Sequence, residues 1–287
     1  MSFLRADRLA TLYLFRPLGA LRRPVRGLPI LMYHSICGAA EGGHPYFHIN
    51  TSPRVFADHL SLLGRAGYRT AMLEDAIQGL SGAPDSTART AVLTFDDGYE
   101  DFYTEAFPIL ARYGAAATVF LPTAYIGSSP RQFKGRRCLS WSQVRELRRA
   151  GIEFGSHTVT HPQLHAVTPS QLRDEVILSK EELEHQLGEP VQSFSYPYAF
   201  PQTDPPFVGR LEALLKESGY RRGVSTAIGR ASASDNPLFL KRLPANSQDD
   251  PLLFQAKLEG AYDWLETLQY AGKLRIHAKA KAAPLCA

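Results

Sequence analysis

The sequence predicts an α/β barrel, because short apolar runs alternate with segments of helical spacing along the chain. Strands that alternate with helices favour a sheet that is covered by its own connecting helices. Several of the apolar runs also lead directly into polar loops, a common place for catalytic groups on a rigid scaffold. At 287 residues, with 44% hydrophobic and 21% charged residues, the chain can bury one large core.

The expected elements follow one another in chain order. Apolar runs predict strands at residues 28–33, 68–72, 91–93, 115–121, 151–154, 191–196, 223–225 and 238–242. Helical spacing, with glycines as stop signals, predicts helices at residues 55–67, 73–80, 102–113, 169–187, 208–218 and 250–268. Ser140 or Ser142 is expected to cap one more helix. Residues 81–89 are expected to form a turn, and residues 122–137 a basic loop.

The composition narrows the class of function. The net charge of +4 arises from 32 basic and 28 acidic residues, which is too mild for a dedicated nucleic-acid-binding protein. The three cysteines, Cys37, Cys138 and Cys286, are widely spaced. They predict neither a disulfide framework nor a cysteine metal site, and they slightly favour a reducing compartment.

Two adjacent carboxylates, Asp96 and Asp97, follow the buried-strand pattern at residues 91–93, and Gly98 interrupts that pattern. Adjacent carboxylates repel each other, and their burial is costly unless a cation or a shared proton offsets the charge. The pair therefore predicts a metal site, whose other ligands should lie elsewhere in the chain.

Two histidines, His157 and His161, follow a second strand pattern at residues 151–154. Residues four apart share one face if the loop coils into a helical turn. Two imidazoles and one carboxylate form a common catalytic set for a divalent metal and leave a position open for water. Surface or capping histidines are the alternative, but the aspartate pair after the earlier strand favours the metal site.

These motifs resemble those of the polysaccharide deacetylase family, the NodB-homology domain of carbohydrate esterase family 4. The stretches TFDDG, SHTVTHP and FSYPY look like the first three motifs of that family. The segments at residues 106–127 and 139–158 are also similar, and the resemblance extends over roughly residues 28–245. The early YH pair and the YPY variant are similar to the exopolysaccharide-type branch.

The resemblance implies a distorted (β/α)7-type barrel in a single domain with N- and C-terminal helical extensions. It divides the chain into a basic amphipathic extension at residues 1–27, the barrel at residues 28–245, and a C-terminal helix with a basic tail at residues 246–287. It also implies a metal-dependent hydrolase that removes N-acetyl groups from an amino-sugar polysaccharide or its precursor and releases acetate.

The resemblance also assigns roles to the motif residues. Asp97, His157 and His161 are the implied metal ligands. Zinc is the expected ion, with cobalt, nickel or manganese as alternatives for the same N/O set. Asp96 is the implied general base, and the backbone amide of Tyr198 is expected to face the acetyl carbonyl.

The chain departs from the general family pattern in three places. Ser195 stands where the family's usual arginine orients the catalytic aspartate, and Ala199 replaces a glycine. Residues 240–245 lack the histidine that usually supplies the general acid. Some exopolysaccharide-type relatives draw this acid from the early YH motif, so His34 is the expected general acid.

Three residues are candidate substrate contacts, namely Tyr196, Pro197 and Trp141. Trp141 has two interpretations, because a tryptophan at a helix start can stack on a sugar or pack into the core. The basic residues of the loop at 122–137 could line the cleft, and a solvated loop is the alternative.

Residues 1–27 differ from the rest of the chain, because six arginines punctuate short apolar stretches. The longest uncharged stretch is far too short to span a membrane, and it lacks a convincing signal-peptide cleavage site. The segment is expected either to make peripheral contact with an anionic membrane surface or to form a helix packed on the domain. A cytoplasmic location, or one on the inner face of the membrane, is favoured.

Two alternative functions stay open. The same fold and metal could cleave an O-acetyl ester or a non-sugar amide. In a different class, the barrel could be a non-catalytic glycan-binding protein. The expected partner is an acetylated glycan in either class of function, and the sequence indicates no oligomeric state.

Overall fold

The computed structural model describes residues 5–20, 27–80 and 89–282. The expected turn at residues 81–89 lies outside the described residues except for Arg89. The first four residues, residues 21–26 of the N-terminal extension and the last five residues of the tail also lie outside them.

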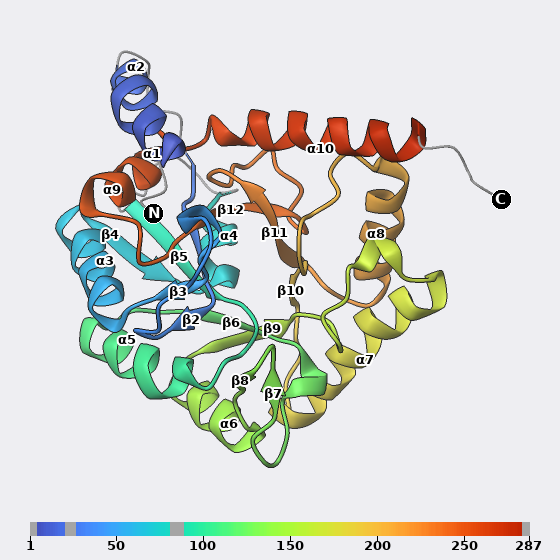
Figure 1. The fold of residues 1–287 in the computed structure, drawn as a ribbon. Coiled ribbons are helices and arrows are strands. Elements are labelled where there is room, and N and C mark those ends of the chain that lie inside the picture. The colour runs from blue at the N-terminus through green and yellow to red at the C-terminus, as the bar shows by residue number, and fades with distance from the viewer. Residues whose placement is uncertain (1–4, 21–26, 81–88, 283–287) are drawn as a thin grey trace.

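Seven parallel strands of the described chain close into a barrel, which Figure 1 shows with the helices around it. In ring order the strands are β1 (Ile30–Tyr33), β12 (Leu240–Pro244), β11 (Arg222–Ile228), β10 (Ser193–Ser195), β9 (Glu153–Ser156), β6 (Thr118–Leu121) and β5 (Arg89–Phe95). The first barrel strand in the sequence pairs with the last one on one side and with β5 on the other, which closes the ring. An eighth strand, β4 (Tyr68–Ala71), pairs with the first half of β5. The predicted seven-strand α/β barrel is therefore confirmed.

The barrel strands are short and buried on both faces. All four residues of β6 are buried, as are the last five of β5. Near-continuous apolar runs are what a parallel sheet between core and helices requires. In the register, Tyr33 of β1 lies opposite Phe95 of β5, and Phe95 lies opposite Val119 of β6. The residues after these strands therefore emerge together at one rim.

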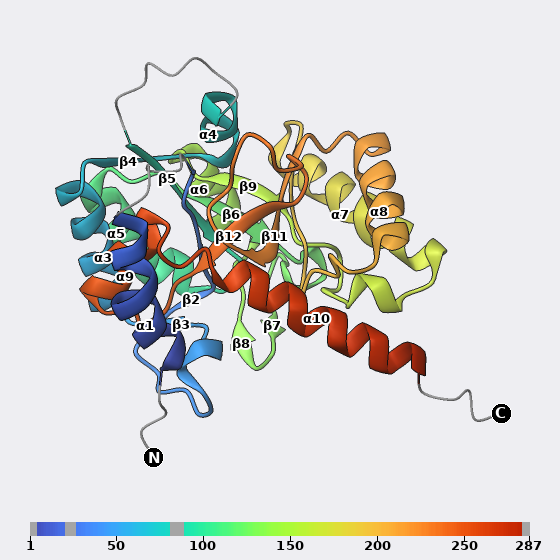
Figure 2. The same ribbon diagram turned by 90° about the horizontal axis from the view of Figure 1, so that it is seen from above.

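Helices surround the barrel, as Figures 1 and 2 show. Ser140, rather than Ser142, caps one of them in a capping box with Gln143, and Thr168 caps another in the same way with Gln171. These side chains satisfy amides that a helix start leaves without partners. The surrounding helices are α3 (Pro53–Arg65), α4 (Leu73–Leu80), α5 (Phe107–Tyr113), α6 (Trp141–Arg149), α7 (Pro169–Leu187) and α8 (Pro205–Glu217), and a π-helical turn (Phe102–Ala106) precedes α5.

The basic loop expected at residues 122–137 contains secondary structure. A 3-10 turn (Thr123–Tyr125) is followed by an antiparallel hairpin of β7 (Gln132–Phe133) and β8 (Arg136–Arg137). Another small sheet joins β2 (Ser35–Ile36) to β3 (Asn50–Thr51), with a 3-10 turn (Pro45–Phe47) between them. Both additions follow barrel strands at the rim where the aspartate and histidine motifs emerge.

The single helix expected at residues 250–268 is wrong, because the structure has two helices there. The first, α9 (Pro251–Glu259), ends at Gly260, whose φ of 88° is the left-handed conformation typical of a helix stop. The second, α10 (Leu265–Ala282), runs well into the basic tail. A glycine inside a helical pattern therefore marked a real boundary.

The N-terminal extension is helical. The helices α1 (Ala6–Ala10) and α2 (Arg16–Ala20) flank a π-helical turn (Thr11–Phe15), and together they are called the N-terminal helix below. The ring of Phe15 stacks on that of Trp264 with centroids 4.6 Å apart, so the N-terminal helix meets the start of α10. Among the described residues, no helix has both the length and the apolar character needed to cross a membrane.

Candidate active site

The aspartate pair lies at the rim, where β5 ends in a tight turn. The amide of Asp96 donates to the carbonyl of Tyr33 at 3.0 Å, so pairing with β1 continues to the last residue before the turn. Asp97 and Gly98 then adopt φ values of 70° and 61°. A Cβ on Gly98 would lie 2.6 Å from the side chain of Leu121, so a larger residue would clash there.

The two predicted histidine ligands lie on the loop after β9, which is not the helical turn that their spacing suggested. Thr158 and His161 have φ values of 69° and 58°, so left-handed residues shape the loop. Glu175 of α7 holds it in place, because its carboxylate accepts from the amides of Val159 and Thr160, both at 2.8 Å. Strain at a functional site is tolerated when such surrounding contacts fix it.

Asp97, His157 and His161 form a buried cluster that fits a divalent metal. Oδ1 of Asp97 lies 3.3 Å from Nε2 of His161 and 3.6 Å from Nε2 of His157. One ligand atom of each residue lies within 4.8 Å of the others. Within the described chain, this carboxylate oxygen is buried without a hydrogen-bond partner. A buried anionic oxygen is costly without compensation, and a cation among these three atoms would supply it.

His157 is prepared to act as a ligand through its Nε2. Its Nδ1 lies 2.8 Å from the carbonyl of Ser195, which can only accept, so Nδ1 carries the proton and Nε2 the lone pair. Burial lowers the pKa of His157 to about 4, although Asp96 opposes the shift. The imidazole is therefore neutral at physiological pH, as metal ligation requires.

The second oxygen of Asp97 is held by protein groups. The hydroxyl of Tyr99 donates to Oδ2 at 3.0 Å, and Nζ of Lys134 lies 3.9 Å from the same atom. Burial alone would raise the pKa of Asp97, but His161 with His34 and His157 outweighs burial and holds that pKa well below its usual range. Asp97 is therefore an anion with one oxygen fixed and one directed at the histidines.

Asp96 is held by an arginine that the motifs did not reveal. Nη1 and Nη2 of Arg242, on β12, donate to the two carboxylate oxygens of Asp96, each at 2.8 Å. Both side chains are almost completely buried. Burial raises the pKa of Asp96, but Arg242, helped by His157, outweighs it, and the pKa falls to about 2. Asp96 is therefore ionised and fixed in orientation.

Ser195 stands where the family's usual arginine was expected, and the structure shows how the chain compensates. Its hydroxyl donates to Asp96 at 3.3 Å and accepts from Nη2 of Arg242 at 3.2 Å. The arginine thus reaches Asp96 from a different strand, and the small serine leaves room beside it. The orientation of Asp96, which the sequence had left in doubt, is supplied by Arg242.

His34 emerges beside the aspartate pair, directly after β1. Burial lowers the pKa of His34, while Asp97 and Asp96 oppose the shift. The neutral imidazole is therefore favoured, and the imidazolium, once formed, is a strong acid. The role of His34 as general acid stays a prediction.

Tyr198 follows β10 in a left-handed conformation with a φ of 57°. Its carbonyl accepts from the hydroxyl of Thr226 at 2.9 Å, which fixes the peptide, and its ring lies edge-on to that of His161 with centroids 4.5 Å apart. The side chain is 43% exposed. Tyr198 therefore lies at the open side of the metal cluster.

The proposed substrate contacts of Tyr196, Pro197 and Trp141 stay predictions. All three residues are buried. Tyr196 packs in an apolar cluster with Phe200, and Trp141 belongs to the main core at the start of α6. Trp141 thus packs into the core, the alternative given for it, and it also lines a pocket between the loop after β6 and α7.

The hairpin of β7 and β8 reaches the site through Lys134. Its Nζ lies over the rings of Phe133 and Tyr198, at 4.5 and 5.0 Å from their centroids. Such placements are favourable for a cation. The basic run of the expected loop was the only sequence signal for this contact, and the structure brings Lys134 of that loop next to Asp97 and Tyr198.

Comparisons with known proteins agree with this geometry. A family model for polysaccharide deacetylases matches residues 83–221. YxkH of Bacillus subtilis, provisionally named as a polysaccharide deacetylase, is 31% identical over 236 residues, which cover 81% of this chain and 76% of YxkH. The poly-beta-1,6-N-acetyl-D-glucosamine N-deacetylase of Staphylococcus epidermidis is 32% identical over 144 residues, and the match covers 47% of each chain.

Solved structures share the barrel. The Streptococcus pyogenes deacetylase PplD, solved in complex with acetate, superimposes with a TM-score of 0.68 at 28% identity, covering 82% of this chain and 99% of PplD. IcaB from Ammonifex degensii superimposes with a TM-score of 0.65 at 21% identity, covering 82% of this chain and 98% of IcaB, and supports the fold alone. Given 31% identity to YxkH over 81% of this chain, the chain belongs to the polysaccharide deacetylase family.

Proposed function

We propose that this protein removes N-acetyl groups from a polysaccharide that contains N-acetylglucosamine, or from its precursor, and releases acetate. One observation carries the proposal: the buried cluster of Asp97, His157 and His161 lies beside Asp96, which Arg242 holds by two hydrogen bonds. The names of the relatives, which include poly-N-acetylglucosamine N-deacetylases, support the choice of substrate.

In the proposed reaction, Asp97, His157 and His161 hold a divalent metal, with zinc as the expected ion. A divalent ion at this position would polarise the acetyl carbonyl and lower the pKa of a bound water toward ~7. The neutral state of His157 and the free oxygen of Asp97 support this assignment. Cobalt, nickel and manganese suit the same donor set.

Asp96 is the proposed general base and takes the proton of the attacking water. Its neighbour Asp97 is committed to the ligand cluster, so the two carboxylates have separate tasks. With a pKa of about 2, Asp96 is ionised at neutral pH and available to accept a proton. Arg242 fixes the direction in which its oxygens point, and the placement of a base determines its efficiency.

The oxyanion and the leaving group need separate partners. The amide of Tyr198 is the proposed donor to the developing oxyanion, and one such donor is worth roughly 3–4 kcal/mol of barrier. His34 is the proposed acid that protonates the leaving amine. Its position directly after β1, near both aspartates, supports that role.

The central experiment measures acetate release from a panel of N-acetylated and O-acetylated glycans, with the metal removed and then restored. We expect release from N-acetylglucosamine oligomers only when a divalent metal is present. Asp96→Asn should retain bound metal and lose activity, whereas His157→Ala should lose the metal itself. Equal metal loss in both variants would contradict the division of roles.

A matched control keeps this result specific to the site. Asp58 is an exposed aspartate on α3, outside the metal cluster, and Asp58→Asn should leave both metal content and acetate release unchanged. If Asp58→Asn lowered activity as much as Asp96→Asn, the loss would reflect a general effect of removing a carboxylate.

An O-acetyl esterase or a non-sugar amidase remains the alternative within the same fold. An ester leaves as an alkoxide, which needs less help from an acid than an amine does. If His34→Ala spares ester cleavage and abolishes amide cleavage, the amide assignment gains support. A glycan-binding protein without activity would show neither bound metal nor acetate release from any member of the panel.

The proposal extends to the place of action. We expect a cytoplasmic protein or one that lies peripherally on the inner face of the membrane, with residues 1–27 making the contact. The net positive charge of this segment, with six arginines and one aspartate, supports membrane contact. Fractionation of cells into soluble and membrane fractions would test it.

A further inference from the structure

The N-terminal helix has its polar side turned toward the protein. Its charged residues in the described range are Asp7, Arg8 and Arg16, and each one is paired. Arg8 pairs with Asp250 at the start of α9, and Arg16 pairs with Glu259 at its end. A helix on a protein surface ordinarily directs its charges to solvent, so this orientation is inverted.

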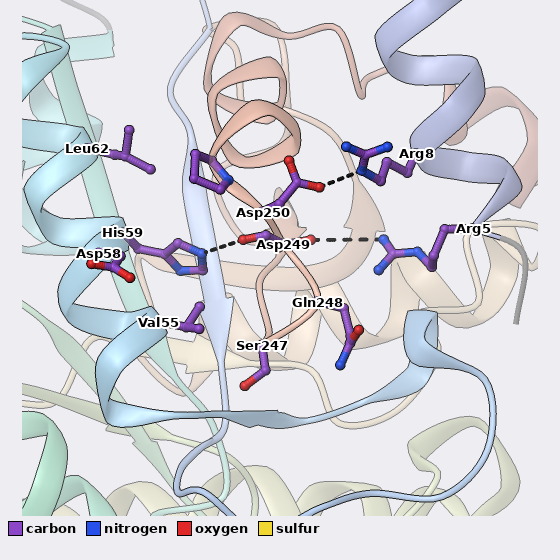
Figure 3. A pocket seen from close by; sticks show the side chains of 11 residues that line it. Arg5, Arg8, Val55, Asp58, His59, Leu62, Ser247, Gln248, Asp249 and Asp250 are labelled. Carbon is purple, nitrogen blue, oxygen red and sulfur yellow. Dashed lines mark hydrogen bonds and ion pairs between the residues drawn. The ribbon is translucent and has the colours of Figure 1, made fainter. Parts of the chain in front are cut away.

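The contact is built around a pocket of about 400 Å³ between the N-terminal helix, α3 and the turn before α9. Figure 3 shows Arg5 and Arg8 reaching Asp249 and Asp250 across this pocket, while His59 contacts Asp249 from the opposite side. Asp249 and Asp250 therefore link the N-terminal helix to α3, since His59 contacts the backbone carbonyl of Asp249.

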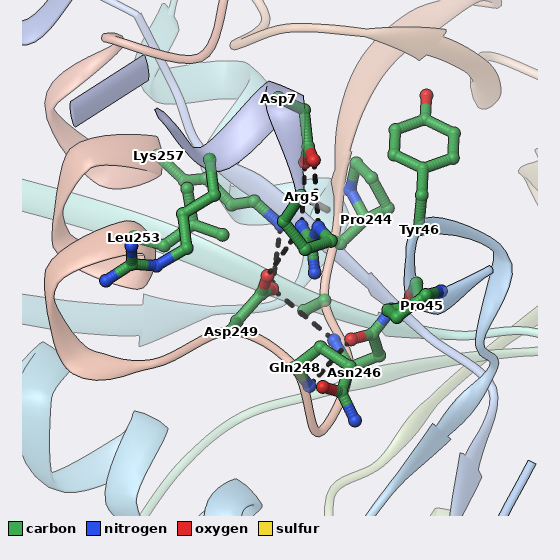
Figure 4. Close-up of polar contacts among 12 residues, drawn as sticks. Arg5, Asp7, Pro45, Tyr46, Pro244, Asn246, Gln248, Asp249, Leu253 and Lys257 are labelled. Carbon is green, nitrogen blue, oxygen red and sulfur yellow. Dashed lines mark hydrogen bonds and ion pairs between the residues drawn. The ribbon is translucent and has the colours of Figure 1, made fainter. Parts of the chain in front are cut away.

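Asp249 is the centre of this attachment. It is 3% exposed and accepts from Lys257 at 2.7 Å, while Arg5 lies 3.9 Å away and is itself joined to Asp7 (Figure 4). The hydroxyl of Tyr262 adds a bond to Asp7 at 2.8 Å. A buried network with several charged partners fixes the N-terminal helix in one orientation.

The outer side of the N-terminal helix is consequently apolar. Every exposed residue in its described range is uncharged, and most are large or hydrophobic. Tyr13 is 74% exposed, Leu14 52%, Leu18 44% and Leu9 40%, and the other exposed members are Ala6, Pro17 and Gly19. Exposed apolar patches of this kind mark protein or membrane interaction sites.

Both ends of the chain carry a net positive charge in the sequence. Residues 1–28 contain six arginines and one aspartate, and residues 265–287 contain four lysines and arginines and one glutamate. The two ends therefore carry +5 and +3, and since the whole chain carries +4, the residues between them carry −4. Arg22, Arg23 and Arg26 come directly after the apolar face in the sequence.

The C-terminal helix α10 adds to the same side of the molecule. Figures 1 and 2 show it on the side of the barrel that also carries the N-terminal helix. Leu268, Tyr270 and Leu274 of α10 are exposed at 56%, 43% and 44%. Hydrophobic side chains and basic residues thus occur together at both ends of the chain, and acidic charge predominates between them.

We propose that the outer face of the N-terminal helix binds the surface of an anionic phospholipid bilayer, with α10 beside it. Leu9, Tyr13, Leu14 and Leu18 enter the boundary between headgroups and acyl chains, and the net positive charge of both chain ends favours an anionic surface. The inference deepens the membrane part of the proposed function, on which it rests, by naming the contact surface and the lipid class.

Vesicle sedimentation tests this inference on the full chain. We expect binding to vesicles of equal parts phosphatidylglycerol and phosphatidylcholine, and at least ~10-fold weaker binding to phosphatidylcholine alone, since each basic residue near an anionic surface adds attraction. Tyr13→Asp with Leu14→Asp should weaken binding to the anionic vesicles at least ~10-fold, because both apolar side chains are lost from the interface.

A matched variant and two further measurements keep the test decisive. Leu178 on α7 is 50% exposed, and Leu178→Asp should bind vesicles like the unchanged protein. Every variant should release acetate from a soluble oligomer equally well, so failure of membrane binding is separate from failure of the proposed activity. Lack of binding to anionic vesicles, or a dimer in solution that Tyr13→Asp with Leu14→Asp dissociates, would overturn the inference.

Discussion

Two buried ion pairs of this protein have similar burial and different surroundings. Asp96 and Arg242 are 2% and 1% exposed, and Asp249 and Lys257 are 3% and 2% exposed. The first pair lies at the barrel rim beside the metal cluster and is joined by two parallel hydrogen bonds. The second lies between the barrel and its terminal helices and is joined by a single contact of 2.7 Å.

The difference shows that burial of a charge pair does not by itself identify an active site. Both pairs carry a large desolvation penalty, which their mutual attraction offsets only with good geometry. Arginine suits the first pair because its planar fork fixes a carboxylate in direction, whereas lysine acts as a point charge. Nζ of Lys257 also donates to the carbonyl of Pro244, at the end of β12. The pair of Asp249 and Lys257, called the outer pair below, therefore secures the strand that presents Arg242.

The largest effect is expected from Arg242→Met. Asp96 would keep its buried charge without a partner, which should cost about 3–5 kcal/mol of unfolding free energy. The loss of orientation should lower kcat/KM by at least ~10²-fold while metal content is retained. Denaturant unfolding, metal analysis and acetate release together check this expectation, and unchanged activity would show that Arg242 has no positioning role.

Lys257→Met should lower stability almost as much as Arg242→Met does, but it should lower activity far less. The unpaired Asp249 should again cost about 3–5 kcal/mol, reduced to the extent that Arg5 compensates. Because the hydrogen bonds of Lys257 go to Asp249 and to the carbonyl of Pro244 rather than to the metal cluster, kcat/KM of the folded variant should stay within about threefold of the original. A loss like that of Arg242→Met would remove the distinction between the two pairs.

A double replacement sharpens the second case. Asp249→Asn combined with Lys257→Met removes both charges, so no buried charge is left unpaired. We expect the double variant to be more stable than Lys257→Met alone by about 1–3 kcal/mol. Denaturant unfolding of the single and double variants measures this coupling, and simple additivity of the two losses would contradict it.

His59 gives the outer pair a smaller dependence on pH. Burial lowers the pKa of His59, although Asp249 opposes the shift. As the pH falls below about 6.5, the unfolded chain binds a proton that the folded chain excludes, so stability falls by at most ~1.4 kcal/mol per pH unit until the lowered pKa is reached. His59→Gln should remove this part of the acid destabilisation. Identical pH profiles of unfolding for both proteins would refute the expectation.

The smallest effect is expected at the exposed ion pair between the N-terminal helix and the end of α9. Arg16 and Glu259 form an ion pair with side chains 30% and 37% exposed. Exposed pairs contribute at most about 1 kcal/mol. Arg16→Gln should therefore change the unfolding free energy by less than this amount, and a larger loss in denaturant unfolding would indicate that the attachment is more cooperative than its contacts suggest.

Sequence reasoning found the residues that are close together in the chain. Asp96, Asp97, His157 and His161 lie in short motifs at strand ends, where the residue types themselves indicate the chemistry. Their arrangement was harder to foresee, because the histidine loop depends on left-handed residues and on Glu175 from a distant helix. The barrel followed from the alternation of strand and helix patterns.

Arg242 and Lys134 could not be predicted in the same way. Arg242 is 146 residues from Asp96 in the chain, and a single arginine within a strand pattern resembles any other. Only the closure of the barrel brings β12 next to β1 and hence near β5. Lys134 depends on a hairpin within a segment that has the composition of a loop. Contacts of this kind follow from topology, which local patterns do not contain.

The closure of the barrel also has a consequence for biosynthesis. Strand β1 pairs with β5 and with β12, so the ring remains open until residues near 244 have been translated. At translation rates of ~5–20 residues per second, Asp96 waits roughly 7–30 s for Arg242 to be synthesised. A nascent chain that already carries the three proposed metal ligands therefore still lacks Arg242, the group that orients the proposed base. The site is therefore complete only after β12 has been synthesised. A chain whose translation ends before β12 is expected to be inactive.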